Sequence, residues 1–267
     1  MNKFIKWIFA IVAIIFIGFG AWYIYENRYR EETQEFNSND IMTNDKNSAE
    51  ESSEIEVVRE EVDNNYITID KNLVRIPILM YHSISDSDPN NNLLVPIKQF
   101  EVEMKWLKDN NFTPMLLEDV VKAFKEGYVP KRPVAITFDD GYSDNYTEAY
   151  RILKENNMKA TFFIITNNID KDSFYMNSSM LKEMNTNGMG IENHTSRHIE
   201  FTNISREDKI SITKEGREDL KEKIGVDSKF ICYPVGRYDE ETIEVQKELG
   251  IEAAVTTEYG IASSNDG

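Results

Sequence analysis

Short apolar runs alternate with helical spacing along most of this chain, and that alternation limits the fold more than any other feature of the sequence. The apolar runs, which resemble buried strands, cover 75–83, 133–138, 159–165, 189–193, 229–234 and 251–257, with a shorter one near 112–115. Helical patterns lie between them, over 97–107, 117–124, 146–153, 178–187, 205–225 and after 239. We therefore predict an α/β fold with about seven parallel strands. An open sheet and a barrel both fit the pattern.

Composition and missing motifs exclude several kinds of protein. The net charge of −17 argues against a nucleic-acid partner, which requires a basic face. No strand is followed by Gly-x-Gly-x-x-Gly, and Gly-x-Ser-x-Gly is absent, so a dinucleotide site and a serine-hydrolase elbow are not expected. The single cysteine, Cys232, can form no internal disulfide, and its apolar neighbours indicate a buried small residue.

The N-terminal residues differ from the rest of the chain. Residues 7–25 form an uncharged apolar run of 19 residues after Lys3 and Lys6, long enough to span nearly all of a bilayer core. We predict an uncleaved single-pass membrane anchor over 1–30, with a cleaved signal peptide as the alternative. Residues 31–65 are acidic and polar, which predicts a disordered linker. The globular domain is expected over 66–267, outside the cytoplasm.

Polar groups follow the predicted strands at the points where they end. His82 ends one strand, Asp139 and Asp140 end another, and His194 and Pro234 end two more. The carboxyl ends of parallel strands meet at one edge of the sheet, where functional groups gather. All three histidines of the chain lie at or just beyond these ends, so we predict a site there.

The pair His194 and His198 is spaced for one metal ion. In a helical turn, residues four apart lie on the same face. Two imidazoles and one carboxylate form the ligand set of a catalytic zinc-type site, and whichever of the two adjacent acids is not a ligand would then serve as a base. The alternatives are surface histidines and an ordinary Asp-Gly turn. His82 fits either a core residue or a general acid, and "YPVG" fits a turn or an oxyanion-binding corner.

The motifs "TFDDGY", "HTSRH" and "YPVG" in this order resemble the polysaccharide deacetylases, the nodulation-protein-B homology family of carbohydrate esterases. The resemblance covers about residues 74–260. The opening "PILMYH" is most similar to the branch that deacetylates poly-β-1,6-N-acetylglucosamine. The resemblance implies a distorted (β/α) barrel with fewer than eight strands and metal-dependent removal of acetyl groups from sugar polymers.

The resemblance also implies a role for each motif residue. Asp139 would be the base that takes a proton from a metal-activated water, and His82 would be the acid. The resemblance also implies one divalent metal ion, with zinc the first choice and cobalt, nickel or iron as alternatives. The residues implied are Asp139, His82 and the backbone N–H of Val235 for catalysis, Asp140, His194 and His198 for the metal, and Tyr142 and Pro234 for substrate. The chain departs from many relatives in lacking an arginine in the third motif and any histidine after His198.

The predicted function is removal of N-acetyl groups from a cell-surface or cell-wall polysaccharide that contains N-acetylglucosamine. The polymer stays open among poly-N-acetylglucosamine, peptidoglycan, chitin oligomers and acetylated xylan, and the oligomeric state is not predicted. One alternative is a non-catalytic glycan-binding protein on a deacetylase fold. Another is a metal-dependent phosphodiesterase, which the scarcity of basic residues near the motifs disfavours.

Overall fold

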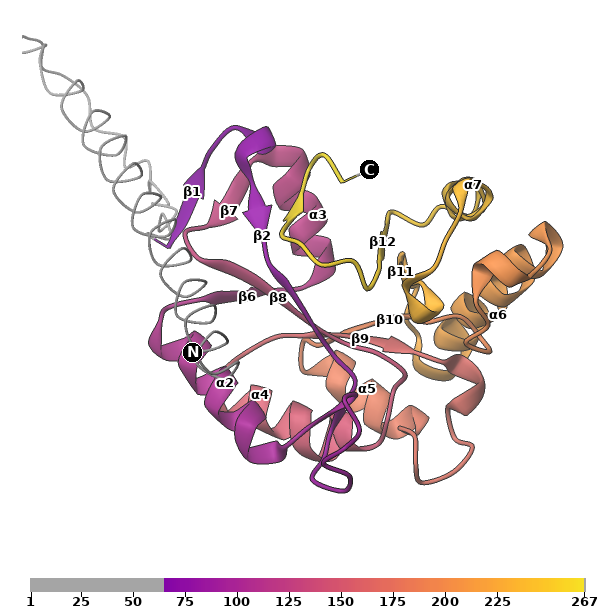
Figure 1. Ribbon diagram of the computed structural model, residues 1–267, viewed down its shortest axis with the longest axis horizontal. Helices are drawn as coiled ribbons and strands as arrows, with labels where there is room; N and C mark the ends of the chain where they lie inside the picture. Colours follow the sequence, from indigo (N-terminus) through magenta and orange to yellow (C-terminus); the bar gives the residue numbers. More distant parts are fainter. Residues whose placement is uncertain (1–64, 267) are drawn as a thin grey trace, which may run out of the picture. The chain divides into compact units, whose positions relative to one another are not determined.

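A seven-stranded parallel sheet forms the centre of the computed structural model, which describes residues 65–266 (Figure 1). Six strands follow the order β12-β11-β10-β9-β8-β3, and β6 pairs with the first half of β8. Their bounds are β3 (Ile78–Tyr81), β6 (Thr113–Met115), β8 (Pro133–Phe138), β9 (Thr161–Ile164), β10 (Gly190–Asn193), β11 (Phe230–Cys232) and β12 (Ala253–Val255). The α/β class and the parallel sheet are therefore confirmed.

The sheet is curled but does not close. Its two end strands are β12 and β3, and no ladder joins them within residues 65–266. The sequence left an open sheet and a barrel as alternatives, and the family resemblance favoured a distorted barrel. The structure is a half-barrel, because strand pairing stops at these two edges.

The helices lie where the apolar spacing predicts them. Their bounds are α2 (Ile97–Asp109), α3 (Leu117–Glu126), α4 (Arg151–Glu155, preceded by a π-helical segment Asn145–Tyr150), α5 (Ser178–Thr186), α6 (Arg206–Ile224) and α7 (Glu240–Glu248). The hydroxyl of Ser205 accepts a hydrogen bond from the N–H of Asp208 at 3.2 Å, as an N-cap does. Gly225 ends α6 with a φ of 85°, which a glycine adopts without strain.

One predicted strand is wrong in its extent. The apolar run 75–83 is broken into three pieces, β2 (Arg75–Ile76), β3 and β4 (Ser83–Ile84). The first break falls at Pro77, which has no N–H to donate to a ladder. The second falls at His82. Only β3 belongs to the large sheet, so the histidine stands at the strand end.

Three two-stranded sheets are separate from the large sheet. Most of their strands were not predicted from the sequence. The pairs are β1 (Tyr66–Thr68) with β7 (Tyr128–Pro130), β2 with β13 (Ala262–Ser263), and β4 with β5 (Leu94–Val95). Strands of two or three residues are too short to show a periodicity in the sequence.

Packed aromatic rings support the end of β8. Phe138 stacks on Phe162 with the ring centroids 4.7 Å apart, and Phe100 packs edge-on against Phe138 at 5.7 Å. All three side chains are fully buried. Because dense packing resists displacement, the residues that follow Phe138 start from a rigid position.

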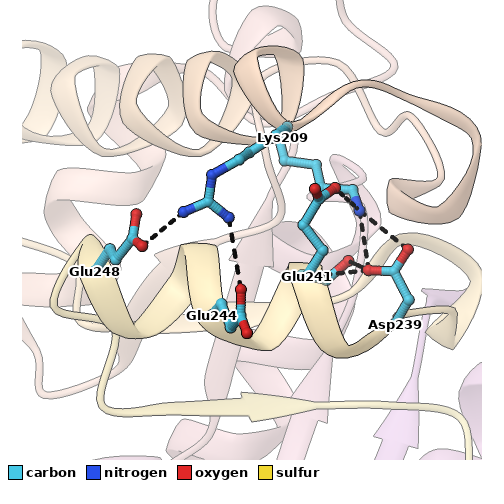
Figure 2. Close-up of polar contacts among 7 residues, drawn as sticks. Lys209, Asp239, Glu241, Glu244 and Glu248 are labelled. Atoms are coloured by element: carbon cyan, nitrogen blue, oxygen red, sulfur yellow. Dashed lines mark hydrogen bonds and ion pairs between the residues drawn. The ribbon is translucent and has the colours of Figure 1, made fainter.

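An ion cluster joins α6 to α7 (Figure 2). The ammonium of Lys209 is buried, although it lies on a helix, and it donates to Asp239 at 2.9 Å and to Glu241 at 2.8 Å. Arg206 extends the cluster to Glu248 at 2.6 Å. Asp239 also caps α7 by accepting from the N–H of Thr242. The two acids therefore compensate the cost of burying an ammonium.

Removing both negative charges from this cluster should destabilise the domain. The double variant Asp239→Asn, Glu241→Gln leaves Lys209 buried without a charged partner, and we expect a loss of about 2 kcal/mol in the free energy of unfolding. Asparagine keeps the helix cap. The control is Glu244→Gln, which removes a long, exposed pair with Arg206 and should change stability by less than about 0.5 kcal/mol. Equal urea midpoints for the two proteins would contradict this account.

The predicted anchor over 1–30 and nearly all of the predicted linker over 31–65 lie outside the described residues, and both stay predictions. Within residues 65–266, no helix is both long enough and apolar enough to cross a bilayer.

Candidate active site

Two adjacent carboxylates leave the end of β8 in a strained turn. The N–H of Asp139 donates to the carbonyl of Tyr81 at 2.9 Å, and the chain then turns through Asp140 and Gly141 with φ values of 72° and 79°. A left-handed aspartate is uncommon and often marks a functional position. Asp139 is 3% exposed and Asp140 is 7% exposed.

One oxygen of each carboxylate lacks a hydrogen-bond donor. The Oδ1 atoms of Asp139 and Asp140 are buried, and neither has a hydrogen-bond partner in the described part of the chain. An unsatisfied buried oxygen costs about 1 to 3 kcal/mol, and more when it is charged. Each of these oxygens is therefore available to a bound ion or a bound water.

The two histidines of "HTSRH" lie in a turn, which corrects the predicted helical turn. Thr195 and His198 have φ values of 64° and 54°, which no helix contains. The hydroxyl of Thr195 accepts from the N–H of His198 at 2.9 Å and holds this turn closed. The rings of His194 and His198 nevertheless lie close together, with their centroids 4.7 Å apart.

A backbone carbonyl sets the tautomer of His194. Its Nδ1 lies 2.9 Å from the carbonyl oxygen of Cys232 at the end of β11. A carbonyl only accepts, so Nδ1 carries the hydrogen and the neutral ring presents the lone pair of Nε2. Metal-binding histidines are oriented in this way in many proteins. Cys232 itself is 4% exposed, as its apolar neighbours predict.

Three possible ligand atoms converge at this point. The Oδ1 atom of Asp140 lies 3.4 Å from Nε2 of His194 and 3.5 Å from Nε2 of His198. Ligands about 2.1 Å from a tetrahedral zinc ion are about 3.4 Å from each other. The separations therefore fit one metal ion held by Asp140, His194 and His198, and the unpartnered Oδ1 of Asp140 supports the same assignment.

The two carboxyl groups have opposite pKa shifts. Burial raises the pKa of Asp139, and the nearby His194 and His82 offset this only in part. Burial also acts on Asp140, but the neighbouring imidazoles of His194 and His198 outweigh it and lower the pKa of Asp140. A carboxylate that ionises easily suits a ligand, and a more basic one suits a proton acceptor.

The imidazole of His82 lies next to the carboxylate of Asp139. Its Nε2 is 3.9 Å from Oδ2 of Asp139. The side-chain amide of Asn145 donates to the carbonyl of His82 at 2.7 Å, and Asp144 accepts from the hydroxyl of Ser83. The sequence analysis missed the roles of Asp144 and Asn145, although both lie in "GYSDN" just after the acid pair.

The "YPVG" segment forms a sharp corner after β11. Val235 has a φ of 52°, which is unusual for a β-branched residue, and no acceptor for its N–H occurs within residues 65–266. A side chain at Gly236 would lie 2.2 Å from the hydroxyl of Thr257, so only glycine fits. Pro234 and Val235 follow β11, whose last residue, Cys232, contacts His194 through its carbonyl oxygen.

A cavity of about 490 Å³ opens beside the proposed ligands Asp140 and His198. Asp140, His198 and Tyr142 all line it, so the structure places the predicted substrate contact Tyr142 beside two proposed ligands. Burial and the charge of Asp140 raise the pKa of Tyr142, which keeps its hydroxyl protonated. Further lining comes from Leu93, Ile165, Asn167, Asn168, Lys171, Tyr175, Ser196 and Arg197.

Comparison with known sequences identifies relatives of the chain. The family profile "Polysaccharide deacetylase" matches residues 126–254. The protein named "Putative polysaccharide deacetylase YxkH" in Bacillus subtilis is 35% identical over 235 residues, which cover 88% of this chain and 83% of that protein. A poly-beta-1,6-N-acetyl-D-glucosamine N-deacetylase of Staphylococcus aureus is 29% identical over 197 residues, or 68% of this chain and 67% of that protein.

Solved structures agree with these sequence matches. The deacetylase PplD of Streptococcus pyogenes, solved in complex with acetate, superposes with a TM-score of 0.70 and 33% identity over 73% of this chain and 88% of that one. IcaB of Ammonifex degensii has a TM-score of 0.65 over 72% of this chain and 88% of that one, and at 21% identity this likeness concerns the fold alone.

Proposed function

This chain belongs to the polysaccharide deacetylase family, and we propose that it removes N-acetyl groups from a polysaccharide containing N-acetylglucosamine. The proposal for the sugar rests on the Staphylococcus aureus relative, whose name specifies a poly-β-1,6-linked polymer. The family supports the reaction class, hydrolysis of a carbon–nitrogen amide bond.

The single observation that carries the proposal is the convergence of Asp140, His194 and His198 beside a second, unpartnered carboxylate. Three ligand atoms leave open coordination positions for water and substrate, as in catalytic zinc sites. Two imidazoles and one carboxylate suit zinc, and also cobalt, nickel or iron. Asp139, outside this set, stays available for proton transfer.

Each residue of the site has a separate role in the proposed hydrolysis. Asp140, His194 and His198 would hold a divalent ion, which when bound would polarise an acetyl carbonyl and lower the pKa of a bound water. Asp139 accepts a proton from the attacking water, for which its raised pKa is suited. The free N–H of Val235 donates to the developing oxyanion. His82, 3.9 Å from Asp139, donates a proton to the sugar nitrogen as it departs.

Acetate release provides the direct test. The purified 267-residue chain is stripped of metal and incubated with poly-β-1,6-N-acetylglucosamine, and then zinc, cobalt, nickel or iron is restored in separate samples. We expect acetate release to fall to background without metal and to recover by at least about a hundredfold with the preferred ion. Peptidoglycan, chitin oligomers and acetylated xylan are tested in parallel to identify the polymer.

Two outcomes would overturn the proposal in different ways. If the metal-free protein still released acetate, the reaction would not require a metal ion. A protein that binds zinc but releases acetate from none of these polymers would instead be a glycan-binding protein on the deacetylase fold.

A further inference from the structure

A loop is fastened by its backbone to the segment that follows the acid pair. The N–H of Met176 donates to the carbonyl of Gly141 at 2.9 Å, and the N–H of Ser143 donates to the carbonyl of Phe174 at 2.9 Å. Tyr142 and Tyr175 face each other across this short antiparallel bridge. Side chains on the loop are therefore held in fixed positions relative to Asp140.

Three aromatic rings cluster on this bridge. Tyr142 stacks on Tyr175 at 5.6 Å, and Phe174 packs edge-on against both, at 5.2 Å from Tyr142 and 5.1 Å from Tyr175. Such contacts between rings are favourable and directional. The cluster is thus a packed unit with a fixed orientation, although it lies at the surface.

The outermost ring of the cluster is exposed to water. Phe174 is 63% exposed, whereas Met176, two residues later on the same loop, is 1% exposed and anchors it. Asp172 accepts from the N–H of Phe174 at 2.8 Å, which fixes the backbone of the exposed residue. A single exposed apolar side chain is ordinary, but one fixed on an ordered aromatic cluster beside a cavity indicates a binding surface.

The cluster forms one wall of the cavity at the acid pair. Tyr142 and Tyr175 line this cavity together with Asp140 and His198. Asn167 and Asn168 also line the cavity and supply amide donors and acceptors. Flat apolar rings and amides together match a sugar, which has apolar C–H faces and a rim of hydroxyls.

We propose that Phe174 and Tyr175 form a platform that stacks against a neighbouring sugar ring of the glycan chain and so makes the enzyme select longer chains. This inference rests on the proposed deacetylase function and extends it to a residue outside the three sequence motifs. Phe174 packs against both tyrosines but is not among the residues that line the cavity, so it suits a sugar ring adjacent to the one that reacts.

The experiment compares chains of different length. The ratio of kcat/KM for a β-1,6-linked N-acetylglucosamine pentamer to that for the monomer is measured with metal restored. We expect this ratio to fall about tenfold in Phe174→Ala and to be retained in Phe174→Trp, which preserves the stacking face. Trp106→Ala is the matched control, since Trp106 is 55% exposed on α2 and does not line the cavity.

A binding measurement separates the platform from the chemistry. In an Asp139→Asn background, which prevents turnover, the Kd for the pentamer should rise about tenfold on adding Phe174→Ala. A length ratio and a Kd that equal those of the Trp106→Ala protein would overturn the platform. If the unsubstituted chain releases no acetate from any length yet binds the pentamer through Phe174, the proposed reaction fails and the platform stands.

Discussion

Replacing Asp139 with asparagine is expected to lower acetate release by about a thousandfold while leaving the bound metal in place. Asparagine has nearly the same shape but cannot accept a proton from water. Asp139 is 3% exposed and its Oδ1 has no hydrogen-bond partner within residues 65–266, so no solvent-exposed group would replace it easily as the base. The measurement is kcat on an N-acetylglucosamine oligomer together with the zinc content of the protein.

The control for this variant is Asp109→Asn on the outer surface of α2. Among residues 65–266, the side chain of Asp109 pairs only with the exposed Lys105, so the loss of its charge should leave both readings unchanged. If Asp139→Asn lost zinc along with activity, Asp139 would be a ligand. If it kept both, the base would be another group.

Replacing His194 with glutamine is expected to weaken zinc binding by at least about a hundredfold and to abolish activity at ordinary zinc concentrations. His194 is almost completely buried, and its Nδ1 is already bound to the carbonyl of Cys232. No other imidazole can take its position. In the unsubstituted protein, zinc at 100 times its Kd should add about 2.7 kcal/mol of stability. This zinc-dependent rise in Tm should disappear in His194→Gln.

His82→Gln is the matched histidine control. Its imidazole contacts Asp139 but is not among the three convergent ligand atoms, so the zinc-dependent rise in Tm should be retained. Its activity should fall on the amide of a sugar, which needs a protonated leaving nitrogen, and should fall much less on an aryl acetate, whose leaving group needs no proton. Loss of the zinc effect in His82→Gln would contradict the division of roles proposed for the three histidines.

Strand ends were the most reliable guide from sequence to site. The apolar run before Asp139 and the run before His194 each predict a buried strand, and the parallel sheet then brings both ends to one edge. The convergence of one of the two acids with His194 and His198 could therefore be predicted from local patterns, whereas the choice of Asp140 came from the family resemblance. The local form of the turn could not, because the hydroxyl of Thr195 binds the backbone and replaces the expected helix.

Features that depend on pairing between distant segments could not be predicted from the sequence. Whether the sheet closes depends on an edge contact between β3 and β12, and no residue pattern within either strand reports it. The bonds of Phe174 to Ser143 and of Met176 to Gly141 are made by backbone groups, which are the same in every residue. Asn145 binds the carbonyl of His82, and Asp144 binds the N–H of Ile84. Both contacts depend on the break in the first predicted strand, which its continuous apolar sequence did not indicate.

The carbonyl of Cys232 that orients His194 has a consequence for how the protein tolerates mutation. A side-chain acceptor in that place could be lost by a single substitution, but every amino acid supplies the same main-chain oxygen. Drift at position 232 can therefore alter the group packed beside Asp139 without removing the hydrogen bond to His194. Mutations at position 232 can therefore affect the proposed base, Asp139, independently of the proposed metal ligand, His194.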